Sequence, residues 1–218
     1  MEQNNIERAL LWNSLCNMGD MVKLKLKVDG HNLVQELEQF KDNWCPYNQK
    51  KDAHNNRWGL PVTSHTGDVA ENWHLNSFGH MQRYHDVEMK EENFTTPTEV
   101  YKNIPQLASL VDTFAPDIGR VHLLRVDEGG FFPPHRDFPG VGPEYFRLLC
   151  TFGKAQPENY AHILDKQLIY PDPEYVHFIN FQKEHSVFSY TNGLHSLILT
   201  VKLNQRTHDL IIKHSMSE

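Results

Sequence analysis

From Gly119 onward the sequence is a series of short apolar runs separated by turns, and this pattern limits the folds that the chain can adopt. The runs cover residues 120–126, 147–152, 176–181, 187–190 and 196–203. Glycine- and proline-rich segments lie between them, and Asn192-Gly193 is a typical hairpin turn. Several short strands at this spacing predict an antiparallel sandwich or barrel. We expect a mainly β fold with flanking helices, built on a double-stranded β-helix (jelly roll) over residues 119–204.

Residues 1–118 are expected to form a helical and irregular N-terminal buttress, so that residues 1–218 make a single domain. Apolar residues recur at helical spacing in residues 6–17, 31–40 and 98–114. In residues 22–28 apolar side chains alternate with lysine, which predicts a half-exposed strand. Short strands are also expected near residues 60–63, within an irregular, aromatic segment.

The composition restricts the partners and the compartment. A formal net charge of -7 without a block of like charge argues against nucleic acid as a partner. Three cysteines without CxxC spacing indicate neither a disulfide framework nor a thiolate zinc site, and they favour a reducing compartment. We find no signal-peptide pattern and no stretch near the ~20 apolar residues of a membrane span. We expect a soluble, cytoplasmic protein with no membrane partner and a small-molecule or peptidyl substrate; the oligomeric state stays open.

The most informative side chains lie in Phe131-Phe132-Pro133-Pro134-His135-Arg136-Asp137. In a strand, residues two apart point to the same face, so His135 and Asp137 would present an imidazole and a carboxylate side by side. A third ligand is expected from His185, which follows the apolar run 176–181. Two histidines and one carboxylate leave positions open on a metal, an arrangement that suits non-haem Fe(II) and its reactions with O2. A structural zinc site would close all four positions. The simpler alternative is a surface ion pair between His135 and Asp137.

The surroundings of this pair resemble the aspartyl/asparaginyl β-hydroxylase family, which includes bacterial hydroxylases of free proline. The resemblance covers roughly residues 45–204. The matching stretches are Gly119–Asp137, Arg57-Trp58-Gly59-Leu60, Phe146-Arg147-Leu148-Leu149 and His185-Ser186-Val187. It implies a jelly-roll oxygenase with Fe(II), and with 2-oxoglutarate and O2 as co-substrates. The implied reaction is hydroxylation of an amino acid, a peptidyl side chain or a small metabolite, with His135, Asp137 and His185 as the metal ligands and catalytic centre.

The resemblance also implies how the other ligands would be bound. Related enzymes carry an arginine about ten residues after the last metal histidine, where it binds the distal carboxylate of 2-oxoglutarate; this chain has His195 there. A histidine lacks the bidentate fork of arginine. Arg147, on the run after the metal pair, is the second candidate for the co-substrate, and either or both residues would contact it. Substrate contacts are expected from Arg57, Trp58 and Arg125.

Two other functions are compatible with the same residues. A catalytically inactive, cupin-like binding protein would explain the loss of arginine at position 195. A hydrolase or isomerase would use the same three ligands with another divalent metal such as Zn(II) or Mn(II). The substrate itself is not indicated by the sequence.

Overall fold

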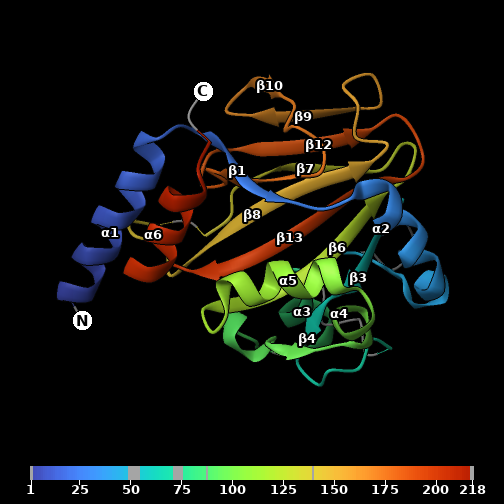
Figure 1. Ribbon diagram of the computed structural model, residues 1–218, viewed down its shortest axis with the longest axis horizontal. Coiled ribbons are helices and arrows are strands. Elements are labelled where there is room, and N and C mark those ends of the chain that lie inside the picture. The colour runs from blue at the N-terminus through green and yellow to red at the C-terminus, as the bar shows by residue number, and fades with distance from the viewer. Residues whose placement is uncertain (1, 49–54, 71–75, 87, 139, 217–218) are drawn as a thin grey trace.

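The structure is a computed structural model that describes residues 2–48, 55–70, 76–86, 88–138 and 140–216. Two antiparallel sheets face each other, and helices lie against the outer side of the larger sheet and at its ends (Figure 1). The helices are α1 (Glu2–Asn17), α2 (Gly30–Leu37), α3 (Phe78–His85), α4 (Glu99–Asn103), α5 (Pro105–Phe114) and α6 (Gln205–His214), with short 3-10 helices η1 (Glu38–Asn43) and η3 (Glu91–Asn93).

The strands are β1 (Met21–Lys27), β2 (Cys45–Pro46), β3 (Arg57–Pro61), β4 (Thr63–Ser64), β5 (Thr96–Pro97), β6 (Ile118–Val126), β7 (Phe131–His135), β8 (Tyr145–Gly153), β9 (Tyr160–Leu164), β10 (Gln167–Ile169), β11 (Tyr175–Ile179), β12 (His185–Ser189) and β13 (Leu194–Lys202). The larger sheet has the order β1-β11-β8-β13-β6-β3-β2 and the smaller one β10-β9-β12-β7, while β4 and β5 form a separate ribbon. From β6 to β13 the chain passes repeatedly from one sheet to the other. This alternation is the topology of a double-stranded β-helix, so the expected jelly-roll fold is confirmed.

The N-terminal part contributes strands as well as helices. β1 pairs with β11 at one edge of the larger sheet, and β3 pairs with β6 toward the other edge. Residue 119 therefore does not separate a buttress from the sheet, because both edges of the larger sheet are made by strands that precede it. The alternation in β1 has the expected cause: Val22 and Leu24 are buried while the lysines between them reach solvent.

Helices α1, α2, α4, α5 and α6 cover the outer face of the larger sheet and bury its apolar side chains. In β6 and β13, Val121, Leu123, Leu197 and Leu199 are almost fully buried in this layer. Trp12 of α1 contacts Phe178 of β11 edge to face, with ring centres 5.6 Å apart. Burial of each such side chain stabilises the fold by about 1.5–3 kcal/mol. This helical layer thus holds the larger sheet rigid. The inner face of the sheet, which the helices do not cover, lines a cavity.

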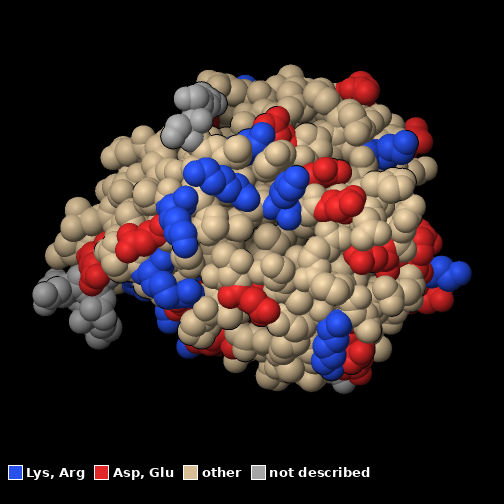
Figure 2. All heavy atoms as spheres, in the orientation of Figure 1, with Lys and Arg blue, Asp and Glu red and all other residues tan. Residues whose placement is uncertain are grey.

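The surface carries charges of both signs. On the face shown in Figure 2, lysine and arginine side chains lie interspersed with aspartate and glutamate, without a large patch of one sign. Within the described residues, no helix combines the length and apolar character required to cross a membrane.

Candidate metal centre and cavity

His135 and His185 are brought together by two neighbouring strands of the smaller sheet. His135 is the last residue of β7 and His185 the first of β12, and the two pair directly across the strands. Their ring centres lie 4.1 Å apart. Asp137 completes the group, so that one ligand atom from each of the three residues lies within 4.8 Å of the others. The convergence expected for these three residues is therefore present in the structure.

Asp137 reaches the group by a turn and not by strand alternation, because β7 ends at His135. The Asp137 backbone N–H donates to the Phe181 carbonyl at 2.8 Å, and Phe138 adopts a left-handed φ of 46°. This bend directs the carboxylate back toward the histidines. The Asp137 carboxylate oxygens lie 3.8 Å from Nε2 of His135 and 3.8 Å from Nε2 of His185.

The hydrogen bonds of both rings leave Nε2 available to a metal. Nδ1 of His135 lies 2.7 Å from the Pro133 carbonyl, and Nδ1 of His185 lies 3.1 Å from the Lys183 carbonyl. A carbonyl can only accept, so each Nδ1 carries the proton and each Nε2 keeps its lone pair. Burial, and next the neighbouring His135, lower the pKa of His185 to about 4, which keeps this ring neutral near pH 7.

The donor set and its spacing fit a divalent metal ion. Two ligand atoms bound at ~2.1 Å each cannot lie more than ~4.2 Å apart. Each imidazole Nε2 lies 3.8 Å from one of the two Asp137 oxygens, Oδ1 for His135 and Oδ2 for His185, and both distances are within this limit. Three ligands on one side leave the opposite side open, where the group faces a cavity between the sheets.

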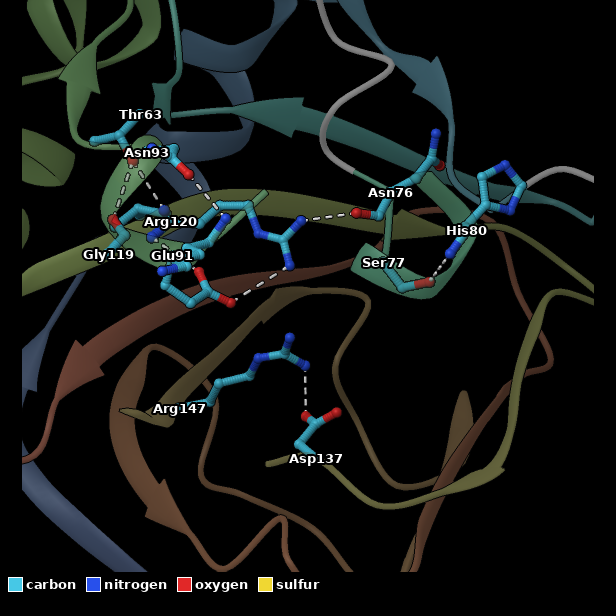
Figure 3. A network of polar contacts seen from close by, with 12 residues as sticks. Thr63, Asn76, Ser77, His80, Glu91, Asn93, Gly119, Arg120, Asp137 and Arg147 are labelled. Atoms are coloured by element: carbon cyan, nitrogen blue, oxygen red, sulfur yellow. Dashed lines mark hydrogen bonds and ion pairs between the residues drawn. The ribbon is translucent and has the colours of Figure 1, made fainter. Parts of the chain in front are cut away.

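Arg147 of β8 pairs with Oδ2 of the same carboxylate, the oxygen that lies 3.8 Å from Nε2 of His185. Figure 3 shows its guanidinium pointing at Asp137, to which Nη1 donates. Burial alone disfavours the charged guanidinium, but Asp137 and Glu91 outweigh this effect and raise the pKa of Arg147. Arg147 lines the cavity, and its charge is matched by the Asp137 carboxylate.

A second, fully buried ion pair lies next to this one. Arg120 of β6 and Glu91 of η3 are 1% and 3% exposed, with nitrogen and oxygen 3.7 Å apart. Arg120 also donates to the Asn76 carbonyl at 2.8 Å (Figure 3). Its guanidinium lies over the Phe78 ring of α3. This pair ties η3 and the start of α3 to the sheet beside the mouth of the cavity.

The cavity has a volume of about 460 Å³ and runs between the two sheets. Leu124, Leu149, Ile198 and Phe181 give it apolar walls, and His80 and Tyr84 of α3 lie at its rim. Polar side chains also face into it. They are His122, Thr151, Tyr160, His162 and Ser196, none of which was singled out by its sequence context. Alternation along β8, where Arg147, Leu149 and Thr151 all line the cavity, is the signal that identifies Thr151.

Three of the residues expected to contact ligands, Trp58, Arg125 and His195, are not among those that line the cavity. They form one row across β3, β6 and β13, with Trp58 opposite Arg125 and Arg125 opposite His195. Their neighbours in the same strands, Arg57 and Ser196 among them, face the cavity, so this row faces the outer side.

The outer row has a packing role. The Arg125 guanidinium lies 5.2 Å and 5.3 Å from the ring centres of Trp44 and Trp58 and pairs with Asp127 at 3.2 Å. His195 stacks on Phe152 with ring centres 5.3 Å apart. Burial lowers its pKa to about 4. It is a neutral, buried ring that has no access to the metal group.

Comparison with known proteins identifies the fold. No protein-family model and no curated protein matches the chain. The chain is similar to a structure of an oxidoreductase of the 2OG-Fe(II) oxygenase family from Burkholderia pseudomallei, with 13% identity, a TM-score of 0.50 and coverage of 92% of this chain and 91% of that one. Shorter similarities are to KdgF from Halomonas sp. (12% identity, TM-score 0.31, 43% of this chain and 76% of that one) and a predicted oxalate decarboxylase from Thermotoga maritima (11%, 0.33, 42% and 73%). At 13% identity, the similarity to the Burkholderia oxidoreductase shows the fold alone.

Proposed function

We propose that this chain is an Fe(II)- and 2-oxoglutarate-dependent dioxygenase that hydroxylates an amino acid, a peptidyl side chain or a small metabolite. The observation that supports this most is the group of His135, Asp137 and His185, which offers three ligands on one side and faces a cavity on the other. Such an open face suits an iron that must bind a co-substrate and O2 together. The protein would act in the cytoplasm, without a nucleic acid or membrane partner.

Each residue around the metal group would have a defined task. His135, Asp137 and His185 would hold Fe(II), and the carbonyls of Pro133 and Lys183 would keep the two rings in the required tautomer. When bound, the iron would supply oxidation by O2, coupled to the oxidative decarboxylation of 2-oxoglutarate to succinate and CO2. Arg147 would fix the second oxygen of Asp137 and so orient its carboxylate toward the metal.

The cavity would exclude water and position the substrate. Its apolar walls, from Leu149 and Ile198 on one sheet to Phe181 opposite, shield the reacting atoms from solvent. Its volume of about 460 Å³ has room for a co-substrate together with a substrate of amino-acid size. A larger peptidyl substrate would insert only one side chain, past the rim formed by α3.

Anaerobic titration with Fe(II) and then 2-oxoglutarate tests the proposal. We expect a weak metal-to-ligand charge-transfer band in the visible, and stabilisation by about 2.7 kcal/mol when Fe(II) is at 100 times its Kd. His185→Ala should lose both effects, because it removes one of three ligands. His208→Ala is the matched control, since His208 contacts Ser14 and Asp209 away from the cavity.

The alternatives give different outcomes in the same titration. Metal uptake without the band would refute the oxygenase and favour a hydrolase or isomerase. No metal uptake would refute it in favour of a binding protein without turnover. On admission of O2, formation of succinate that depends on His185 would support the proposed reaction.

A further inference from the structure

Arg57 is a buried cation with no anionic partner among the described residues. It is the first residue of β3, faces the cavity and is 8% exposed. Its guanidinium lies 4.7 Å from the centre of the Phe132 ring, and its Nε makes no hydrogen bond. Within the described part of the chain, no carboxylate lies within ion-pair distance of it, whereas Arg147 and Arg120 have Asp137 and Glu91. A buried charge is costly unless it is paired, so this position favours an anionic ligand.

Other polar groups face the same cavity. The Tyr160 and Thr151 hydroxyls are buried close to each other, and neither has a hydrogen bond to any other described group. Tyr160 packs in one cluster with Val126 and Phe132. Val126 pairs with Arg57 across the strands, and Phe132 lies under the Arg57 guanidinium. A guanidinium and a phenol at the same end of the cavity are suitable donors to a carboxylate.

This end of the cavity lies a short distance from the metal group. The Arg57 guanidinium lies over Phe132, so Phe132 and its partner Val187 mark the level of Arg57 in the smaller sheet. His135 is three residues from Phe132 along β7, and His185 is two residues from Val187 along β12. Two to three strand residues therefore separate Arg57 from the histidines. At ~3.3 Å per residue the separation is ~7–10 Å. A five-carbon diacid spans ~5 Å between its terminal carbons. A metal–ligand bond of ~2 Å and a contact of ~3 Å bring the total to ~10 Å. A five-carbon ligand that chelates the metal at one end would thus reach Arg57 with the other.

We propose, on the basis of the function proposed above, that Arg57 binds the distal carboxylate of the metal-chelating 2-oxo acid, and that Arg147 does not. Arg147 already donates to Asp137. It also lies at a different level of the sheet from Arg57: Arg147 pairs with Thr200 of β13, whereas Arg57 is level with Leu194 of β13, because both pair with Val126 of β6. Thr200 and Leu194 are six residues apart along β13. The two arginines therefore have separate tasks. Arg147 positions a metal ligand, and Arg57, at the start of β3, selects a dianionic 2-oxo acid.

A pair of 2-oxo acids that differ only at the far end tests this assignment. 2-Oxoglutarate and 2-oxopentanoate have five carbons each, but the second ends in a methyl group. Their Kd values would be measured anaerobically on the Fe(II)-loaded protein from the charge-transfer band, and by calorimetry with Co(II) in place of iron. The unsubstituted protein should prefer 2-oxoglutarate by roughly 10- to 100-fold, the range of a charge-assisted hydrogen bond.

Two matched substitutions separate the arginines. Arg57→Met should reduce this preference to less than about 3-fold and leave the affinity for the metal unchanged, because the methionine keeps the contact with Phe132 but has no charge. Arg147→Met should retain the preference. Arg57→Lys, which keeps the charge, should retain part of it, and it serves as the second variant if Arg57→Met does not fold.

The outcomes distinguish this inference from the proposed function. A preference that survives Arg57→Met, or that is lost in Arg147→Met alone, would overturn the role of Arg57 and leave the oxygenase intact. Equal binding of the two acids by the unsubstituted protein would do the same. If neither acid binds to the metal-loaded protein, the proposed function fails and the role of Arg57 fails with it.

Discussion

Buried neutral histidines should make this protein sensitive to mild acid. Burial lowers the pKa of His195 to about 4, and burial, with smaller effects of His185 and His135, lowers the pKa of His162 to about 3. Both side chains are less than a tenth exposed. In the unfolded chain each would titrate near ~6.5. Between pH 6.5 and about 4 the unfolded chain therefore binds protons that the folded protein cannot, and stability is lost as the pH falls.

The size of this effect follows from the two pKa values. Above pH 6.5 both states hold neutral rings and the contribution is constant. At pH 5 each histidine costs about 2 kcal/mol, since 1.5 pH units separate that pH from the unfolded pKa and each unit is worth ~1.4 kcal/mol. His195 and His162 together would remove about 4 kcal/mol, a large part of the ~5–15 kcal/mol that stabilises a typical protein.

Urea unfolding of the metal-free protein at several pH values measures this loss. Between pH 6 and 5 the free energy of unfolding should fall by at least about 2.4 kcal/mol, and in His195→Asn by about 1.2 kcal/mol less. The asparagine amide can still donate to the Gly193 carbonyl, which accepts from Nδ1 of His195. The lost packing of the ring against Phe152 lowers stability equally at every pH. The slope of the free energy of unfolding against pH therefore reports only the protonation of His195. An unchanged slope in His195→Asn would refute the depressed pKa.

Two further predictions concern the contacts that hold the mouth of the cavity. Glu91→Ala should destabilise the protein by about 3–5 kcal/mol because it removes the carboxylate that pairs with the buried Arg120 guanidinium, and Arg120→Met in the same chain should restore part of the loss; additive losses in urea unfolding would contradict this coupling. Thr98→Ala should cost about 1–2 kcal/mol, since the hydroxyl accepts from Val100 at the start of α4. Thr113→Ala, at an exposed hydroxyl within α5, is the control and should change the Tm little.

The parts of the fold that the sequence predicts are those whose inward residues are aliphatic or whose turns are rich in glycine. The runs at residues 120–126 and 196–203 predict β6 and β13 because both faces of these strands are buried. β9 is not predicted, since its inward residues are Tyr160 and His162, which read as polar until the cavity explains them. α6 is missed for a similar reason: only Thr207 and Ile211 of its ten residues are buried.

The metal group could be predicted from the sequence and the full ligand set could not. His135, Asp137 and His185 have spacing and residue types that suggest a metal, and the structure brings them together. The direction of Arg57, Trp58, Arg125 and His195 depends on strand register, and a shift of one residue reverses the face. From its spacing along the sequence, His195 was expected at the distal carboxylate of 2-oxoglutarate. The strand register instead directs His195 to the outer face of the larger sheet and Arg57 to the cavity.

The balance of charge between the sheets restricts what the cavity can bind. Arg57, Arg120 and Arg147 are matched by only two carboxylates, Asp137 and Glu91, so the described interior carries one excess positive charge. A divalent metal raises the excess to three, and a dianionic 2-oxo acid lowers it again to one. Because charge is costly away from water, the metal-loaded cavity favours binding of the diacid before a neutral substrate. The same balance disfavours a substrate that carries a cationic group into the cavity, so amino groups should remain at the rim beside α3.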